Sequence, residues 1–200
     1  MSLRHRSVGA RNNERLEFLG DAVLNMVAAE ALFEQRPEAP EGDLSRLRAA
    51  LVREKTLAQL ARESGIGEFL ELGSGELRSG GSRRASILAD AVEALIAAVY
   101  LDGGFGPARA FVLRLLEERL DNLPAAETLK DAKTRLQEWL QARGRPLPEY
   151  EVLSVSGAAH DQHFVAACRL CDETRQTRGE GRGRRRAEQA AAANMLQELT

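Results

Sequence analysis

The sequence predicts two domains, an all-α domain followed by a small α+β domain with the element order α-β-β-β-α. Apolar residues recur at three- and four-residue steps through the first half, and no strand pattern occurs before residue 145. Beyond that point alternating and β-rich runs appear. A segment with a proline and few large apolar residues, at 121–128, separates the two patterns. We therefore expect domains at 1–123 and 129–200, joined by a linker at 124–128.

The helices of the first domain are predicted from apolar periodicity and from their stop signals. Pro37 ends the first helix, and Asp43 is expected to cap the second, which has a break near Glu54. Repeated glycines between residues 65 and 81 predict a loop region with short turns. A strongly apolar helix follows, and Gly103 ends it. The predicted helices cover residues 14–35, 43–60, 87–99 and 107–120.

The second domain is predicted to place two helices on one face of a three-stranded sheet. Tyr150, Val152 and Ser154 alternate with residues of the other face, which is typical of a strand. An alanine-rich helix closes the chain. The predicted helices cover 132–142 and 184–199, and the predicted strands cover 150–155, 163–170 and 174–178.

Composition excludes several classes of protein. Hydrophobic residues make up 44% and charged residues 29% of 200, a mixture that can bury a core. No stretch approaches ~18 uninterrupted apolar residues, so a membrane span is excluded. Two cysteines exclude a disulfide scaffold, and the start lacks a secretory pattern. We therefore expect a soluble, cytoplasmic protein.

The charge distribution is uneven. The chain carries 28 basic and 30 acidic residues, net −2, which taken alone argues weakly against nucleic-acid binding. Residues 129–200 hold 12 basic and 10 acidic residues, net +2, so residues 1–128 are net −4. Five arginines lie between Arg178 and Arg186. A bias toward arginine, in a chain with only three lysines, is the simplest cause of that cluster.

Carboxylates lie at helical spacing in two of the predicted helices. Glu14, Glu17 and Asp21 share one helix face. Asp90 and Glu93 share a face of a helix that is otherwise almost purely apolar. Buried carboxylates are costly unless a cation neutralises them, and oxygen ligands suit Mg²⁺ or Mn²⁺. The alternative is that these acids form solvated faces or pair with nearby arginines.

A second set of residues has the types that bind zinc but the wrong local structure. His160, His163, Cys168 and Cys171 spell H-x2-H-x4-C-x2-C. In a strand at ~3.3 Å per residue, His163 and Cys168 would lie ~16 Å apart. We therefore expect no zinc, with Cys168 as a small core residue.

The acidic motif closely resembles the signature of the ribonuclease III family. The match is NERLEFLGDAV at residues 13–23, and four further segments occur in the family's order. They are HRS at 5–7, EGD at 41–43, GELRSGG at 75–81 and ILADAVEA at 87–94. The resemblance implies an endonuclease that hydrolyses double-stranded RNA to 5′-phosphate and 3′-hydroxyl ends with short 3′ overhangs. Precursors of ribosomal RNA and structured messenger leaders are the expected substrates.

The resemblance also assigns residues. It implies that Glu17, Asp21, Asp90 and Glu93 hold Mg²⁺, with Mn²⁺ as a possible substitute, and that Asp21 and Glu93 are catalytic. Glu14 and Glu41 match accessory acids that border the cleavage valley; from spacing alone Glu41 would be only a cap or surface acid. Phe18 matches a residue that inserts into the partner subunit, so a homodimer is implied.

The second half resembles the double-stranded RNA-binding domain of bacterial family members. In that frame, polar side chains of the first helix reach the minor groove of an A-form duplex, whose major groove is too narrow to enter. His160 reaches a second minor groove, and arginines at the last helix contact phosphates. The implied RNA-binding residues are Thr134, Gln137, Glu138, Gln141, His160, Arg184, Arg185 and Arg186.

Two departures and two alternatives accompany this interpretation. Family members usually carry about two dozen more residues before His5, including a first helix, so a shortened chain with Met1, Ser2 and Leu3 as a leader is expected. Trp139 stands where the family commonly has tyrosine.

The first alternative is a non-catalytic RNA-binding protein, which should lack one of the six acids. The second is an acidic helical scaffold, which would leave the RNA-binding pattern unexplained.

Overall fold

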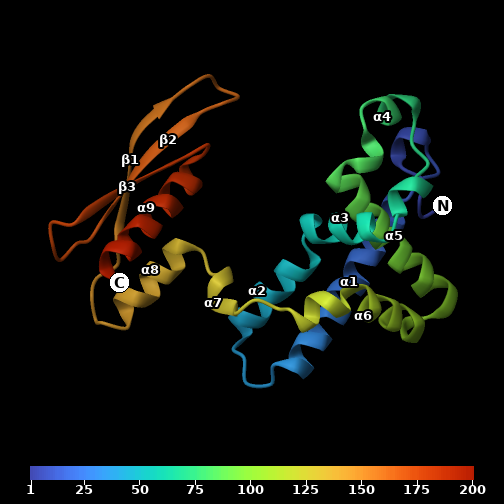
Figure 1. The fold of residues 1–200 in the computed structure, drawn as a ribbon, viewed down its shortest axis with the longest axis horizontal. Coiled ribbons are helices and arrows are strands. Elements are labelled where there is room, and N and C mark those ends of the chain that lie inside the picture. The colour runs from blue at the N-terminus through green and yellow to red at the C-terminus, as the bar shows by residue number, and fades with distance from the viewer. The chain divides into compact units, whose positions relative to one another are not determined.

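The chain folds into two compact units in the computed structural model, which describes residues 1–200. The units are Met1–Leu129 and Lys130–Thr200 (Figure 1). The predicted fold class, an all-α domain followed by an α+β domain, is confirmed. None of the helices is long and apolar enough to cross a membrane. The first unit contains α1 (Glu14–Gln35), α2 (Glu41–Val52), α3 (Glu54–Glu63), α4 (Ser74–Arg78), α5 (Ala85–Gly103), α6 (Phe105–Asp121) and α7 (Ala126–Leu129). The second contains α8 (Ala132–Gln141), β1 (Glu149–Ser156), β2 (His163–Arg169), β3 (Gln176–Gly181) and α9 (Arg184–Leu199).

The first unit is built around the packing of α1 against α5. Both helices carry buried apolar residues, and α2, α3 and α6 cover them (Figure 1). The burial of these side chains is the main favourable term for folding of this unit. Its largest fully buried side chains are Leu24, Val27, Leu32, Leu57, Leu88, Val92, Ile96 and Leu116.

Gly20 lets α1 and α5 approach until their backbones touch. A Cβ atom built at Gly20 would lie 1.8 Å from the carbonyl oxygen of Glu93, where no side chain fits. Gly20 lies between Glu17 and Asp21 on α1, and Glu93 is one of the acidic residues of α5. A close backbone contact of the two helices therefore lies within the acidic motif.

The helices of the first unit differ in detail from the sequence prediction. The predicted break near Glu54 is present, because Arg53 is extended between α2 and α3. The predicted cap at Asp43 is wrong. Helix α2 already begins at Glu41, so Asp43 lies in its first turn and forms an ion pair with Arg46. The glycine-rich region, expected to hold only short turns, contains α4 between two 3₁₀ turns. The segment predicted as a linker runs into α7, which packs against α2.

The second unit is an antiparallel sheet in the order β1-β2-β3, with α8 and α9 packed together over one face. Leu136 and Leu140 of α8 meet Met195 of α9 and Cys168 of β2 in one apolar core. The register of β1 shifts between Val152 and Ser154, so the simple alternation predicted for this strand does not continue to its end. Cys168 is buried, as expected for a small core residue, while the Cys171 thiol donates to the carbonyl oxygen of Leu147.

Two glycines of β3 allow α9 to lie directly on the sheet. A Cβ at Gly179 would be 2.0 Å from the Ala191 nitrogen, and one at Gly181 would be 2.7 Å from Arg186 Cβ. The predicted third strand covers residues 174–178 and stops before these two glycines. Here the missing side chains make room for the helix, so β3 extends to Gly181.

Replacement of Gly20 by alanine should destabilise the first unit. The added Cβ would overlap the Glu93 carbonyl, so α1 and α5 must separate, at a cost of at least about 2 kcal/mol. Thermal unfolding followed by circular dichroism measures the effect. Gly106→Ala is the matched control, because Gly106 is also helical but has open space around it. It should be neutral or stabilising by about 0.4–1 kcal/mol. Equal melting temperatures for wild type and Gly20→Ala would contradict the close helix contact.

Candidate functional site

Three carboxylates from the two central helices converge in the first unit. Glu17 comes from α1, and Asp90 and Glu93 come from α5. One oxygen from each lies within 4.8 Å of the others, and all three side chains are half-buried. The i, i+3 spacing places Asp90 and Glu93 on the same face, and the contact at Gly20 brings Glu17 to them.

The protonation of these acids reflects their crowding. Burial raises the pKa of Glu93 to about 8, and the neighbouring Asp21, Glu17 and Asp90 add to the effect. Burial also raises the pKa of Glu17 and of Asp90 above their ordinary values. A set of oxygen donors that repel one another matches a hard divalent cation, because such an ion replaces the lost hydration and offsets the repulsion. The residues present therefore fit the metal that the sequence predicts.

Asp21 lies beside this cluster but is not one of its three converging members. It is exposed, and among the neighbouring acids its charge raises the pKa of Glu93 the most. Its Oδ1 accepts a hydrogen bond from Asn25 Nδ2 at 2.8 Å, one turn further along α1. Asn25 was missed by the sequence analysis, although its i, i+4 spacing from Asp21 is a usable signal.

The two accessory acids occupy different surroundings. Glu14 lies at the start of α1, and its Oε1 is 3.6 Å from Arg6 Nη1. Its negative charge helps to raise the pKa of Glu17, although burial of Glu17 is the larger cause. Glu41, at the start of α2, accepts a hydrogen bond from Ser45 at 2.6 Å and lines a groove between α1 and α2. Glu41 therefore does not join the converging carboxylates within one chain.

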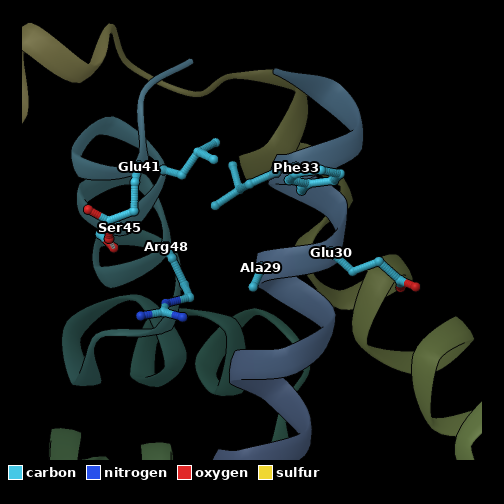
Figure 2. A pocket seen from close by; sticks show the side chains of 8 residues that line it. Ala29, Glu30, Phe33, Glu41, Ser45 and Arg48 are labelled. Atoms are coloured by element: carbon cyan, nitrogen blue, oxygen red, sulfur yellow. Dashed lines mark hydrogen bonds between the residues drawn. The ribbon is translucent and has the colours of Figure 1, made fainter. Parts of the chain in front are cut away.

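The groove that contains Glu41 has an exposed aromatic side chain on its rim. Figure 2 shows Ala29 of α1 and Arg48 of α2 on opposite walls, while Glu30 points away. Phe33 is 71% exposed. On the same face of α1, Phe18 is 81% and Met26 59% exposed. An apolar stripe on a central helix is unusual for a surface that faces only water.

In the second unit the predicted RNA-binding residues of α8 form one row. Gln137, Glu138 and Gln141 are exposed, and Thr134 is half-buried at the start of the helix. Their i, i+3, i+4 and i+7 spacing places all four on one face. Asp131 caps this helix by accepting a hydrogen bond from the Thr134 N–H at 2.9 Å.

The remaining predicted RNA-binding residues lie on a loop and at the start of α9. His160 is exposed in the loop between β1 and β2. This loop begins at Gly157, whose φ of +92° favours glycine. Three arginines, Arg184 to Arg186, begin α9, where no side chain caps the helix. Arg184 has an internal partner, since its Nε donates to Glu188 at 2.8 Å. The sequence analysis also missed Glu188.

The fold and the two sites define a class of protein: an acid-lined helical unit suited to metal-assisted hydrolysis, joined to a unit of α-β-β-β-α order with cations at a helix start. Comparison with known proteins agrees. The family described as Ribonuclease-III-like matches residues 2–120, and the family described as Double-stranded RNA binding motif matches residues 132–199.

Relatives match this chain over nearly its whole length. Over 198 residues the chain is 59% identical to ribonuclease 3 of Alkalilimnicola ehrlichii and 56% identical to ribonuclease 3 of Dechloromonas aromatica. These matches cover 99% of this chain and 87% and 89% of the relatives. A crystal structure of the nuclease domain of ribonuclease III from Campylobacter jejuni is 48% identical, with a TM-score of 0.57, and the match covers 62% of this chain and 82% of that one.

The chain belongs to the ribonuclease III family. It is an endoribonuclease, and its second unit is a double-stranded RNA-binding domain. The resemblance seen in the sequence is confirmed.

The crowded carboxylates should make stability depend on pH and on metal. Because the pKa of Glu93 is higher in the folded chain than its ordinary value of 4.5, the folded state binds its proton more tightly. Stability should therefore fall as pH rises from the ordinary pKa to about 8. In a chelator at about pH 9, Glu93→Gln should melt several degrees above wild type, and near pH 4 this difference should vanish.

Added Mg²⁺ should reverse the order of the two melting temperatures, so that wild type melts above Glu93→Gln. Mg²⁺ at 100 times its dissociation constant should stabilise wild type by about 2.7 kcal/mol and should have little effect on Glu93→Gln. Calorimetric melting at several pH values measures both effects. Glu68→Gln, a change at an exposed acid outside the cluster, should behave as wild type. A Glu93→Gln variant that is less stable than wild type at high pH in chelator would contradict the proposed crowding.

Proposed function

We propose that this chain is a Mg²⁺-dependent endoribonuclease that cuts both strands of an RNA duplex, with Glu17, Asp21, Asp90 and Glu93 as the metal-binding acids. The observation that carries the proposal is the convergence of Glu17, Asp90 and Glu93 within 4.8 Å, with Asp21 beside them. Mn²⁺ is the expected substitute, because it accepts the same oxygen ligands. The chemistry that such an ion supplies is activation of water and stabilisation of charge on the phosphate.

The acidic side chains have different proposed roles around the reacting phosphate. Glu17 of α1 and Asp90 of α5 would hold the ion. Asp21 and Glu93 are the catalytic pair, and Asn25 orients Asp21 by its hydrogen bond. Water attack with departure of the 3′ oxygen leaves 5′-phosphate and 3′-hydroxyl ends. The proposed substrates are ribosomal RNA precursors and structured messenger leaders in the cytoplasm.

The domain assignment follows the same division. Residues 1–123 are the proposed catalytic domain, 124–128 the linker and 129–200 the RNA-binding domain. Supporting this, all the convergent acids lie in the first unit and all the predicted RNA-contacting residues lie in the second. The row on α8 and His160 are assigned to minor grooves, and Arg184 to Arg186 to phosphates.

The active assembly is proposed to be a homodimer. Phe18, Met26 and Phe33 form an exposed apolar stripe on α1, and Phe33 also lines the groove in Figure 2. A second copy would cover the stripe, and Phe18 of each copy would insert into the groove of the other. Glu41 lines that groove and would lie at the subunit interface, consistent with its role as an accessory acid. Two sites, one per subunit, would cut the two strands and leave short 3′ overhangs.

Cleavage of a long, fully paired RNA tests the activity. Wild type should cut it in Mg²⁺ and leave it intact in chelator. Glu93→Gln should bind the duplex with unchanged affinity but cut at least about 100-fold more slowly, because one ligand of the ion is lost. Gel analysis of products and a binding titration measure the two effects separately. The control Glu68→Gln should cut normally. Normal cleavage by Glu93→Gln would show that the assignment of Glu93 is wrong.

Replacement of Phe18 tests the assembly. Wild type should sediment with a mass near twice 21.9 kDa, whereas Phe18→Glu should sediment as a monomer, because a charge cannot be buried in the groove without a partner. Phe69→Glu is the matched control: Phe69 is 69% exposed and does not line the groove. Wild type that is monomeric at micromolar concentration, or a dimeric Phe18→Glu variant, would rule out this interface.

A further inference from the structure

Glu188 is a buried carboxylate that holds one cation from each of two helices. The residue is 7% exposed, one turn into α9. Its Oε2 accepts from Lys133 Nζ of α8 at 2.7 Å, and its Oε1 accepts from Arg184 Nε at 2.8 Å. Burial alone would raise the pKa of Glu188, but the hydrogen bonds from Lys133 and Arg184 lower it, so the carboxylate stays charged. We call Lys133, Glu188 and Arg184 the carboxylate clamp.

Other contacts hold the α8 side of the clamp in place. The Lys133 N–H donates to Gln189 Oε1 of α9 at 3.1 Å. The Lys133 ammonium also lies 4.0 Å from the centre of the Tyr150 ring in β1. Lys133 is thus fixed by contacts to α9 and to the sheet, and the first turn of α8 is tied to the second turn of α9.

The clamp joins the two helix starts that carry the proposed RNA contacts. Lys133 precedes Thr134, the first residue of the row on α8 assigned to the minor groove. Arg184 precedes Arg185 and Arg186, which are exposed and assigned to phosphates. An A-form duplex has a fixed spacing between its minor groove and the phosphates of the adjacent major groove, so the two helix starts must hold a matching separation.

We propose that Glu188 is a positioning residue for duplex RNA: through the clamp it fixes the separation of the α8 and α9 starts and orients Arg184 toward the phosphates. The inference rests on the proposed assignment of these helix starts to RNA. It adds a residue that itself makes no contact with the ligand.

The sign of the effect separates positioning from simple electrostatics. Glu188 is an acid beside a surface that binds a polyanion, so loss of its charge alone should tighten binding. Loss of the clamp should instead weaken binding, because the two contacts no longer match the duplex at the same time. A structural role alone would lower the melting temperature without changing affinity far below that temperature.

The experiment measures affinity of the full chain for a fluorescent RNA duplex longer than the ~16 bp that such a domain spans, in chelator. Glu188→Gln should weaken binding by about 10-fold at a temperature where melting curves show the variant folded. Glu198→Gln is the matched control. It removes the same charge from the exposed end of the same helix, and should bind as wild type within about twofold. Unchanged or tighter binding by folded Glu188→Gln would overturn the proposal.

A second variant covers the case in which Glu188→Gln does not fold. Lys133→Met keeps the length of the side chain and leaves Glu188 paired with Arg184. It should also weaken binding, and unchanged affinity would overturn the proposal. Where both variants fold, Glu188→Gln should add little to Lys133→Met, since each breaks the same clamp. Fully additive losses would show independent contacts and would also overturn it.

A spectroscopic signal reports the clamp directly. In nuclear magnetic resonance spectra of the full chain, the Arg184 Nε–H should be protected from exchange in wild type, because it donates to the carboxylate. It should lose this protection in Glu188→Gln and keep it in Glu198→Gln. Wild type that fails to bind the duplex would overturn the proposed function and this inference together. Tight binding by both wild type and Glu188→Gln would overturn the inference alone.

Discussion

The contact of α1 with α5 at Gly20 is the constraint on which the rest of the first unit depends. Each helix alone presents acids at helical spacing, and neither alone brings three carboxylates together. Because a Cβ at Gly20 would lie 1.8 Å from the Glu93 carbonyl oxygen, the helices are closer here than any residue other than glycine would allow. That crossing places Glu17 beside Asp90 and Glu93. Apolar burial around it, from Leu24 to Ile96, supplies the free energy that holds like charges in one place.

The two units use buried carboxylates in opposite ways. In the first unit Glu93 has a raised pKa, because it is buried and the charged groups around it are acids. That arrangement is unfavourable for the folded chain by itself and favourable for binding a divalent ion. In the second unit Glu188 has two cations of the chain within hydrogen-bonding distance, and its pKa is lowered. A carboxylate that is already paired with two cations is poorly suited to bind metal, and removal of either cation would leave part of a buried charge uncompensated.

The helices were the most predictable part of the fold, because periodic apolar residues and glycine or proline stops are local signals. The break between α2 and α3 and the long α5 follow from them. Local signals failed where a neighbour decided the outcome. The third strand was predicted to end at residue 178, but β3 continues through Gly179 and Gly181, which face α9, where any side chain would clash. Asp43 suggested a cap, but the helix starts two residues earlier and Asp43 pairs with Arg46 instead.

The sequence by itself determined the family, the two domains and which acids share a helix face, because spacing within one helix is set by the backbone. Only the tertiary structure decided which of those acids meet. It groups Glu17 with Asp90 and Glu93. Asp21 lies beside this group and accepts a hydrogen bond from Asn25. Glu41 lines a separate groove. It also turns Glu188, one acid among many in the sequence, into the link between α8 and α9. Distances between helices depend on how side chains of distant segments pack, and no local pattern records them.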